Sequence, residues 1–166
     1  MIDLPSVSLE DRLIEAYRVA TRSPDPSTQN GAILLRDDKI LCSSSNSFPV
    51  GVENKPERLE RPDKYAFVEH AERGVIYVAA RRGIETKGTT MIVPWFACSD
   101  CARAIICAGV SHVVGHQNMM DATPDHWKES IAVAFQMLDE SGVTYELISA
   151  KLGAPQIRFN GELWQP

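Results

Sequence analysis

Two stretches decide the fold and the chemistry expected of this chain: Val68-Glu69-His70-Ala71-Glu72 and Pro94-Trp95-Phe96-Ala97-Cys98-Ser99-Asp100-Cys101. The first offers an imidazole and the second a C-x-x-C pair of thiols, each at the start of an expected helix. A structural zinc site uses four protein ligands, whereas a catalytic one uses three and leaves the fourth position to water. Because the stretches supply three ligands, they predict a catalytic zinc site formed by His70, Cys98 and Cys101.

Glu72 adds a proton carrier to this ligand set, since it follows His70 by two residues. A carboxylate at that spacing can accept and return protons beside the metal without binding it. H-x-E combined with C-x-x-C is the signature of zinc nucleobase deaminases, in which the Glu is the general acid and base. Alternatively, Cys98 and Cys101 could be buried helix thiols or a redox pair, but a redox pair would not explain Glu72.

On these motifs the sequence resembles the cytidine and deoxycytidylate deaminase superfamily, and within it most closely the dCMP deaminases. The similarity runs from about residue 9 to 147 and includes Arg22–Ala32, which matches R-S-x-D-P-x-T-Q-x-G-A, and Asn46–Gly51, which matches N-G-F-P-x-G. The resemblance implies zinc as the cofactor and Glu72 as the catalytic residue. It also implies a homo-oligomer.

The resemblance further implies a set of substrate contacts. The backbone N–H of Ala71 would hold the pyrimidine carbonyl, and Asn46 would bind the sugar 3′-hydroxyl. Arg22 and Ser23 are the candidates for the 5′-phosphate, because a guanidinium pairs with two phosphate oxygens. Each has an alternative: Asn46 could hold a turn, and Arg22 could balance the dipole of a helix end.

Two positions depart from the family pattern. Ala97 stands where a proline normally precedes the first cysteine, which could alter the loop that carries the base. Ser43–Ser47 replaces a G-Y-N-G segment associated with control by nucleoside triphosphates, so that regulation is not carried over to this chain.

Composition limits the class of partner. The chain has 166 residues, with 17 basic and 22 acidic side chains, a net charge of −5 and no basic cluster. Polyanion binding requires clustered Lys and Arg, so a small substrate is expected and nucleic acid is not; the resemblance implies that the small substrate is a nucleotide. No apolar stretch approaches the roughly 20 residues that span a bilayer, so no membrane contact and a cytoplasmic location are expected.

The hydrophobic pattern predicts an α/β fold and a single domain over residues 1–166, in which 149–166 form a C-terminal tail without clear periodicity. The resemblance implies that this domain is a deaminase domain. A helical segment between the last two strands permits a parallel crossover. The resemblance implies a three-layer α/β/α sandwich around a five-stranded mixed sheet whose last two strands are parallel. The expected helices are 9–22, 67–82, 98–107 and 124–140, and the expected strands are 31–36, 39–43, 89–93, 112–115 and 143–148.

Several residues keep structural interpretations. His116 is expected to be structural, and Trp95 and Phe96 could line the base pocket or only pack.

The preferred function is the hydrolytic deamination of dCMP, in which dCMP and water give dUMP and ammonia. The alternatives are a zinc deaminase of a free nucleoside, base or other amino-heterocycle and, as a third class, a non-catalytic zinc-binding assembly module.

Overall fold

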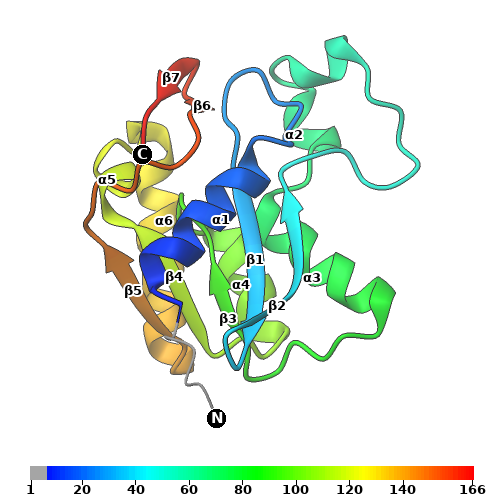
Figure 1. Ribbon diagram of the computed structural model, residues 1–166. Helices are drawn as coiled ribbons and strands as arrows, with labels where there is room; N and C mark the ends of the chain where they lie inside the picture. Colours follow the sequence, from blue (N-terminus) through cyan, green and yellow to red (C-terminus); the bar gives the residue numbers. More distant parts are fainter. Residues whose placement is uncertain (1–6) are drawn as a thin grey trace.

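In the computed structural model, which describes residues 7–166, the first two strands form a hairpin at one edge of the central sheet (Figure 1). β1 (Gly31–Arg36) and β2 (Lys39–Ser45) are antiparallel, and Arg36 pairs with Lys39 across the turn. Asp37 and Asp38 both have positive φ, at 49° and 61°. This geometry is that of a type I′ turn, whose twist matches that of the strands it joins. Asp37 and Asp38 thus form the two-residue turn of the hairpin.

The remaining strands complete a five-stranded mixed sheet in the order β2-β1-β3-β4-β5. β1 is antiparallel to β3, whereas β3, β4 and β5 are mutually parallel. The predicted mixed sheet and its parallel final pair are both confirmed. The three strands are β3 (Thr90–Ile92), β4 (His112–His116) and β5 (Thr144–Ile148).

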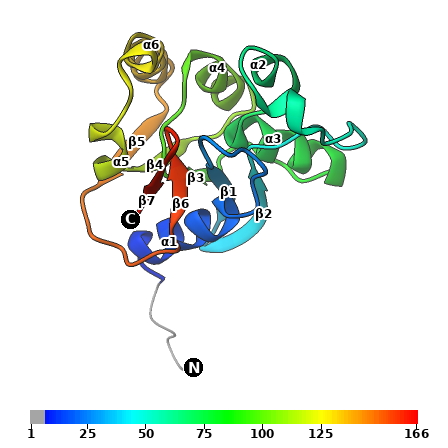
Figure 2. The ribbon, with the colours of Figure 1, turned by 90° about the horizontal axis from the view of Figure 1, so that it is seen from above.

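Helices cover both faces of the sheet and give the three layers that were predicted (Figure 2). α1 (Leu9–Ala20) packs on one face, where Ile33 and Leu35 join its core. The alternate residues of β1, Ala32 and Leu34, join the core of the other face, as the period of two in a strand requires. That face carries α3 (Ala71–Arg82), α4 (Ser99–Cys107) and α6 (Asp125–Ser141). Within residues 7–166, no helix has the length and apolar character needed to cross a membrane.

One helix begins later than the sequence predicted. The helix expected from residue 67 is divided into α2 (Lys64–Phe67) and α3, with an extended segment at 68–70 between them. The reason is a β-bridge, in which the backbones of Ser47 and Glu69 exchange hydrogen bonds of 3.0 and 2.8 Å. The bridge holds His70 in an extended conformation and makes it the N-cap of α3.

Several short elements were not predicted. A 3-10 helix at Pro56–Leu59 lies between β2 and α2, and α5 (Gln117–Asp121) follows β4. The tail forms a second hairpin from β6 (Ile157–Phe159) and β7 (Glu162–Trp164).

The C-terminal segment is fastened to the body of the molecule near α1. Ile157 and Phe159 are buried in a cluster with Tyr17. His116 lies within hydrogen-bond distance of both parts, with Nδ1 at 2.7 Å from the Tyr17 hydroxyl and Nε2 at 2.9 Å from the carbonyl oxygen of Ala150. His116 therefore joins α1 to the start of the tail.

Candidate metal centre and substrate pocket

The three residues predicted as metal ligands lie together. His70 Nδ1 is 3.6 Å from Cys98 Sγ and 3.5 Å from Cys101 Sγ, and the three ligand atoms all lie within 4.8 Å of one another. Zinc bonds of about 2.3 Å to sulfur and 2.05 Å to nitrogen, at a tetrahedral angle, separate the two atoms by about 3.6 Å. The donor set and its spacing therefore fit a single tetrahedral zinc ion.

Two helix N-termini position these ligands. His70 is the N-cap of α3 and Cys98 is the N-cap of α4, and neither side chain caps its own helix with a hydrogen bond. The unpaired N–H groups and positive dipole ends of both helices therefore favour negative charge at the site. α6 also holds the start of α4 in place, because the Ser99 N–H donates a 3.1 Å hydrogen bond to the Ser130 hydroxyl.

The two thiols differ in acidity. A hydrogen bond from Cys101 lowers the pKa of Cys98 to about 4 against the effect of burial, and His70 lowers it further. The hydrogen bond to Cys98, together with burial, raises the pKa of Cys101 well above its usual value. The pair therefore favours one thiolate, stabilised by the second thiol and by His70. Since zinc binds thiolates, loading the site would release the proton of Cys101.

Glu72 lies in the first turn of α3 and is buried, with 3% of its surface exposed. Burial raises the pKa of Glu72 above its usual value, and the nearby His70 opposes that rise. A carboxyl group whose pKa is raised toward neutrality is suited to carry a proton as both acid and base. Glu72 lines the same pocket as His70 and Cys98.

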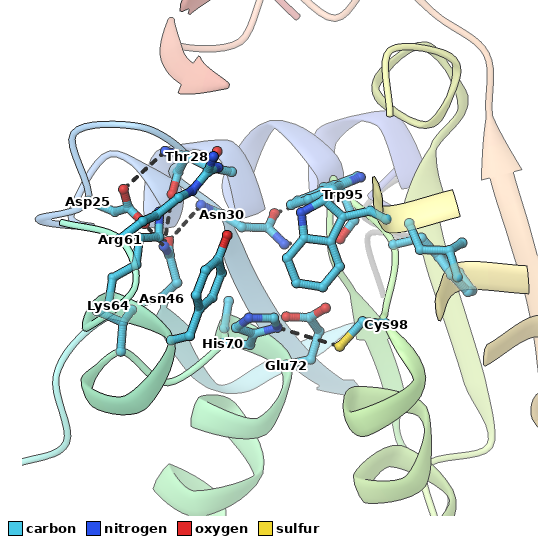
Figure 3. Close-up of a pocket in the computed structure, with 16 residues that line it drawn as sticks. Asp25, Thr28, Asn30, Asn46, Arg61, Lys64, His70, Glu72, Trp95 and Cys98 are labelled. Atoms are coloured by element: carbon cyan, nitrogen blue, oxygen red, sulfur yellow. Dashed lines mark hydrogen bonds and ion pairs between the residues drawn. The ribbon is translucent and has the colours of Figure 1, made fainter. Parts of the chain in front are cut away.

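The metal centre forms the floor at one end of a pocket of about 690 Å³, open mouth included (Figure 3). Figure 3 shows Cys98 and Glu72 toward one end and Asp25, Arg61 and Lys64 toward the other. The pocket therefore has a metal-binding end and a charged end.

Asp25 organises the charged end. Its carboxylate is buried and accepts hydrogen bonds from the backbone N–H groups of Ser27 and Thr28, at 2.8 and 3.2 Å. Its other oxygen lies 2.8 Å from the Lys64 ammonium, and both side chains are almost fully buried. Within residues 7–166, no ion pair engages Arg61, which lines the pocket and whose guanidinium carbon lies 5.9 Å from the centre of the Tyr65 ring.

The structure brings some of the predicted substrate residues into the pocket and not others. Asn46 and Ala71 line it, but Arg22 and Ser23 do not. Asn46 also holds the loop, since its side chain accepts from the Asn30 N–H and donates to the carbonyl of Thr28. The Ser23 hydroxyl accepts a hydrogen bond from the Asp25 N–H. The geometry therefore gives no support to phosphate contacts by Arg22 and Ser23.

Aromatic side chains close the pocket above the metal end. Trp95 and Trp127 meet edge to face with ring centroids 5.6 Å apart, and Trp127 meets His70 in the same way at 5.8 Å. The Trp95 indole N–H donates a 3.1 Å hydrogen bond to the Thr123 hydroxyl, which fixes the ring. Phe96 touches the pocket but is buried and stacks on Phe135. Trp95 is thus a pocket wall, whereas Phe96 mainly packs.

Sequence reasoning missed several of the pocket residues, among them Arg61, Lys64 and Trp127. Lys64 and its partner Asp25 lie 39 residues apart in the chain, so no local spacing relates them. Trp127 belongs to the apolar pattern of α6, and a helical period does not separate a pocket wall from a core position.

Comparison with known proteins places these motifs in a family. Residues 8–117 match the model of the cytidine and deoxycytidylate deaminase zinc-binding region. A protein of Aliivibrio fischeri named "uncharacterized deaminase in luxG 3'region" is 34% identical over 128 residues, which cover 77% of this chain and 84% of that protein. The deoxycytidylate deaminase of Mus musculus is 29% identical over 152 residues, which cover 87% of this chain and 82% of that protein.

Solved structures share the fold at lower identity. The dCMP deaminase of cyanophage S-TIM5, in complex with dCMP and dUMP, is similar with a TM-score of 0.63 and 22% identity over 84% of this chain and 96% of that chain. A guanine deaminase from Nitrosomonas europaea has a TM-score of 0.53 and 16% identity over 85% of this chain and 77% of that chain. The fold alone therefore does not select the substrate. The ligand geometry, the H-x-E and C-x-x-C motifs and the matched region agree, and the chain belongs to the cytidine and deoxycytidylate deaminase zinc-binding family.

Proposed function

We propose that this deaminase is a zinc-dependent hydrolase that converts dCMP and water to dUMP and ammonia. The observation that carries the proposal is the pocket itself. It joins a His-Cys-Cys ligand set and a buried carboxyl group, Glu72, to a second end that carries Arg61 and Lys64. A pyrimidine ring at the first end and a phosphate at the second match this arrangement.

His70, Cys98 and Cys101 would hold the zinc ion. When bound, zinc supplies Lewis acidity that makes a water molecule nucleophilic near neutral pH. Glu72 accepts a proton from the attacking water as the new bond to ring carbon C4 forms, and it delivers a proton to the ring nitrogen. Glu72 then accepts a second proton, from the new hydroxyl group on C4, and passes it to the exocyclic amino group. The bond from C4 to this amino group breaks, ammonia leaves, and the C4 carbonyl of dUMP forms. The raised pKa of Glu72 fits a group that is protonated and deprotonated within one turnover.

The family resemblance supplies the contacts to the nucleoside. The backbone N–H of Ala71, at the N-terminus of α3, would donate to the pyrimidine carbonyl, and Asn46 would bind the sugar. Trp95 and Trp127 would contact the ring, because apolar aromatic walls suit a heteroaromatic base.

The charged end supports a nucleotide rather than a nucleoside. Arg61 has no ion-pair partner within residues 7–166, and Lys64 has one, Asp25, for its three N–H donors. A guanidinium and an ammonium at the same end of a pocket can both donate to a phosphate group. We therefore propose Arg61 and Lys64 as the contacts to the 5′-phosphate, in place of Arg22 and Ser23.

A second candidate function keeps the chemistry and changes the substrate to a free nucleoside, base or other amino-heterocycle. Ala97, where the family has proline, favours it because this residue adjoins Cys98 in the loop beneath the base. A non-catalytic zinc module is disfavoured, since such a module would not need the buried Glu72.

Ammonia release from dCMP, deoxycytidine, cytosine and guanine separates these functions. We expect dCMP to have the highest kcat/KM. Arg61→Gln should raise the KM for dCMP about tenfold, as expected for loss of a charged hydrogen bond, and leave that for deoxycytidine unchanged. Arg18→Gln, on the exposed face of α1, is the control and should change neither. Release from another compound but not from dCMP would overturn the proposed substrate.

Three broader features belong to the same proposal. We propose a single deaminase domain over residues 1–166, a cytoplasmic location and a homo-oligomeric state. Light scattering of the purified protein measures its mass against the 18.4 kDa of one chain. A monomer at working concentrations would contradict the assembly.

A further inference from the structure

The C-terminal hairpin lies alongside the loop that lines the charged end of the pocket. In Figure 1, β6 and β7 stand next to the loop that joins α1 to β1. Four hydrogen bonds connect the two segments. They are Gln29 N–H to Arg158 O at 2.8 Å, Arg158 N–H to Gln29 Oε1 at 2.9 Å, Gly161 N–H to Ser27 O at 2.8 Å and Asn160 N–H to Thr28 Oγ1 at 3.2 Å. The hairpin therefore engages three consecutive loop residues.

The same hairpin also supports the aromatic wall. Phe159 is buried and meets the Trp95 ring edge to face at 5.1 Å between centroids. Phe159 also meets Trp164 of β7 edge to face, with ring centroids 5.8 Å apart. An aromatic pair of this geometry is favourable beyond the area it buries, so Phe159 restricts the position of Trp95.

These two contacts reach one connected part of the pocket. Thr28 and Trp95 both line it, and Asn30 ties the loop to the wall. The Asn30 side chain donates to the Trp95 carbonyl at 3.0 Å and accepts from the Trp95 N–H at 3.3 Å. Among the described residues, no hydrogen bond or ion pair joins 157–164 to a metal ligand or to Glu72.

We propose that the hairpin formed by residues 157–164 is a positioning element that holds the Thr28 loop and Trp95 in the substrate-binding arrangement. It lies outside the matched family region of 8–117. A loop that is already ordered loses less conformational entropy when the ligand binds, which increases affinity. The hairpin should therefore act on substrate binding and leave the metal centre and the chemical step unchanged. This inference rests on the proposed deaminase function.

Two variants test the inference from its two contacts. Phe159→Leu removes the ring that supports Trp95. Gln29→Leu removes the side-chain acceptor of the Arg158 N–H and also the hydrogen bond from the Gln29 amide to the Ser23 carbonyl, so Phe159→Leu is the variant that tests the hairpin alone. Leu163→Ala, on the exposed side of the same hairpin, is the matched control. We expect KM for dCMP to rise about three- to tenfold in each test variant, the range given by losing one or two modest contacts. We expect kcat within about twofold, unchanged zinc per chain and no effect in the control.

Amide hydrogen exchange of the ligand-free protein gives a readout that needs no substrate. Exchange at residues 27–30 should become faster in both test variants, while α4 keeps its wild-type rates. Unchanged exchange at 27–30 would overturn the proposal, and so would a fall in kcat or zinc content at constant KM. If the wild type deaminates another compound instead of dCMP, the proposed substrate fails, and the same KM comparison with that compound decides the role of the hairpin.

Discussion

Replacing Lys64 by Met tests the buried ion pair at the charged end of the pocket. The Lys64 ammonium lies 2.8 Å from Asp25 Oδ2, with side-chain exposures of 11% and 3%. At this separation the attraction is about 6 kcal/mol for an effective dielectric constant of 20, and desolvation of both charges offsets part of it. Removing one partner of a buried pair costs about 3–5 kcal/mol, because the other charge stays buried and unpaired. Lys64→Met should therefore strongly destabilise the fold.

Urea and thermal unfolding at a fixed zinc concentration measure this effect. For a chain of 166 residues, a loss of about 3–5 kcal/mol lowers Tm by about 6–20 °C. The double variant Asp25→Asn/Lys64→Met should recover a large part of the loss, since the oxygen that accepts from Ser27 and Thr28 remains. The coupling free energy from the double-mutant cycle should be about 2 kcal/mol or more. If Lys64→Met lowers the free energy of unfolding by less than about 1 kcal/mol, and the double-mutant cycle gives no coupling free energy, the reasoning is refuted.

Two further predictions concern stability. Burial lowers the pKa of His116 below its usual 6.5. As the pH falls, His116 is therefore protonated in the unfolded chain at a higher pH than in the folded protein. The stability that neutral His116 contributes is complete above about pH 6.5 and is lost as pH falls toward the pKa of the folded protein. The urea midpoint should fall more steeply between pH 7.5 and 5.5 in the wild type than in His116→Gln, and equal slopes would contradict this. Gly31→Ala would place its Cβ 2.5 Å from the backbone nitrogen of Ala20, and overpacking against backbone should cost about 1–3 kcal/mol. In Gly74→Ala the nearest atom is a serine hydroxyl that can rotate, so a smaller loss in urea unfolding is expected, and equal losses would contradict the packing argument.

The sheet could be predicted because its signals are local. Each strand is a short apolar run, and the turn residues Asp37 and Asp38 mark the first hairpin. The second hairpin carries a similar signal that the sequence interpretation missed. Asn160-Gly161 separates β6 from β7, both residues have positive φ, and Asn-Gly between two short β-rich runs is typical of a type I′ turn.

The start of α3 could not be predicted from periodicity. The apolar spacing continues through residues 67–70, and a bridge to Ser47, 22 positions earlier than Glu69, is what extends the chain there. The residues of the pocket were also predictable only where their signals are local in sequence. The metal motifs are compact in sequence and were identified, whereas Lys64 meets Asp25 only through the tertiary fold.

The central claim is that Glu72 moves protons at a zinc ion held by His70, Cys98 and Cys101. The most direct test measures zinc per chain and ammonia release from dCMP on the same preparations of wild type and Glu72→Ala. The account predicts one zinc per chain in both proteins. It also predicts that kcat of the variant falls by about 10²–10⁴-fold, the range for removing a general acid–base group. Full turnover by Glu72→Ala, or a wild-type protein that releases ammonia without bound zinc, would contradict it.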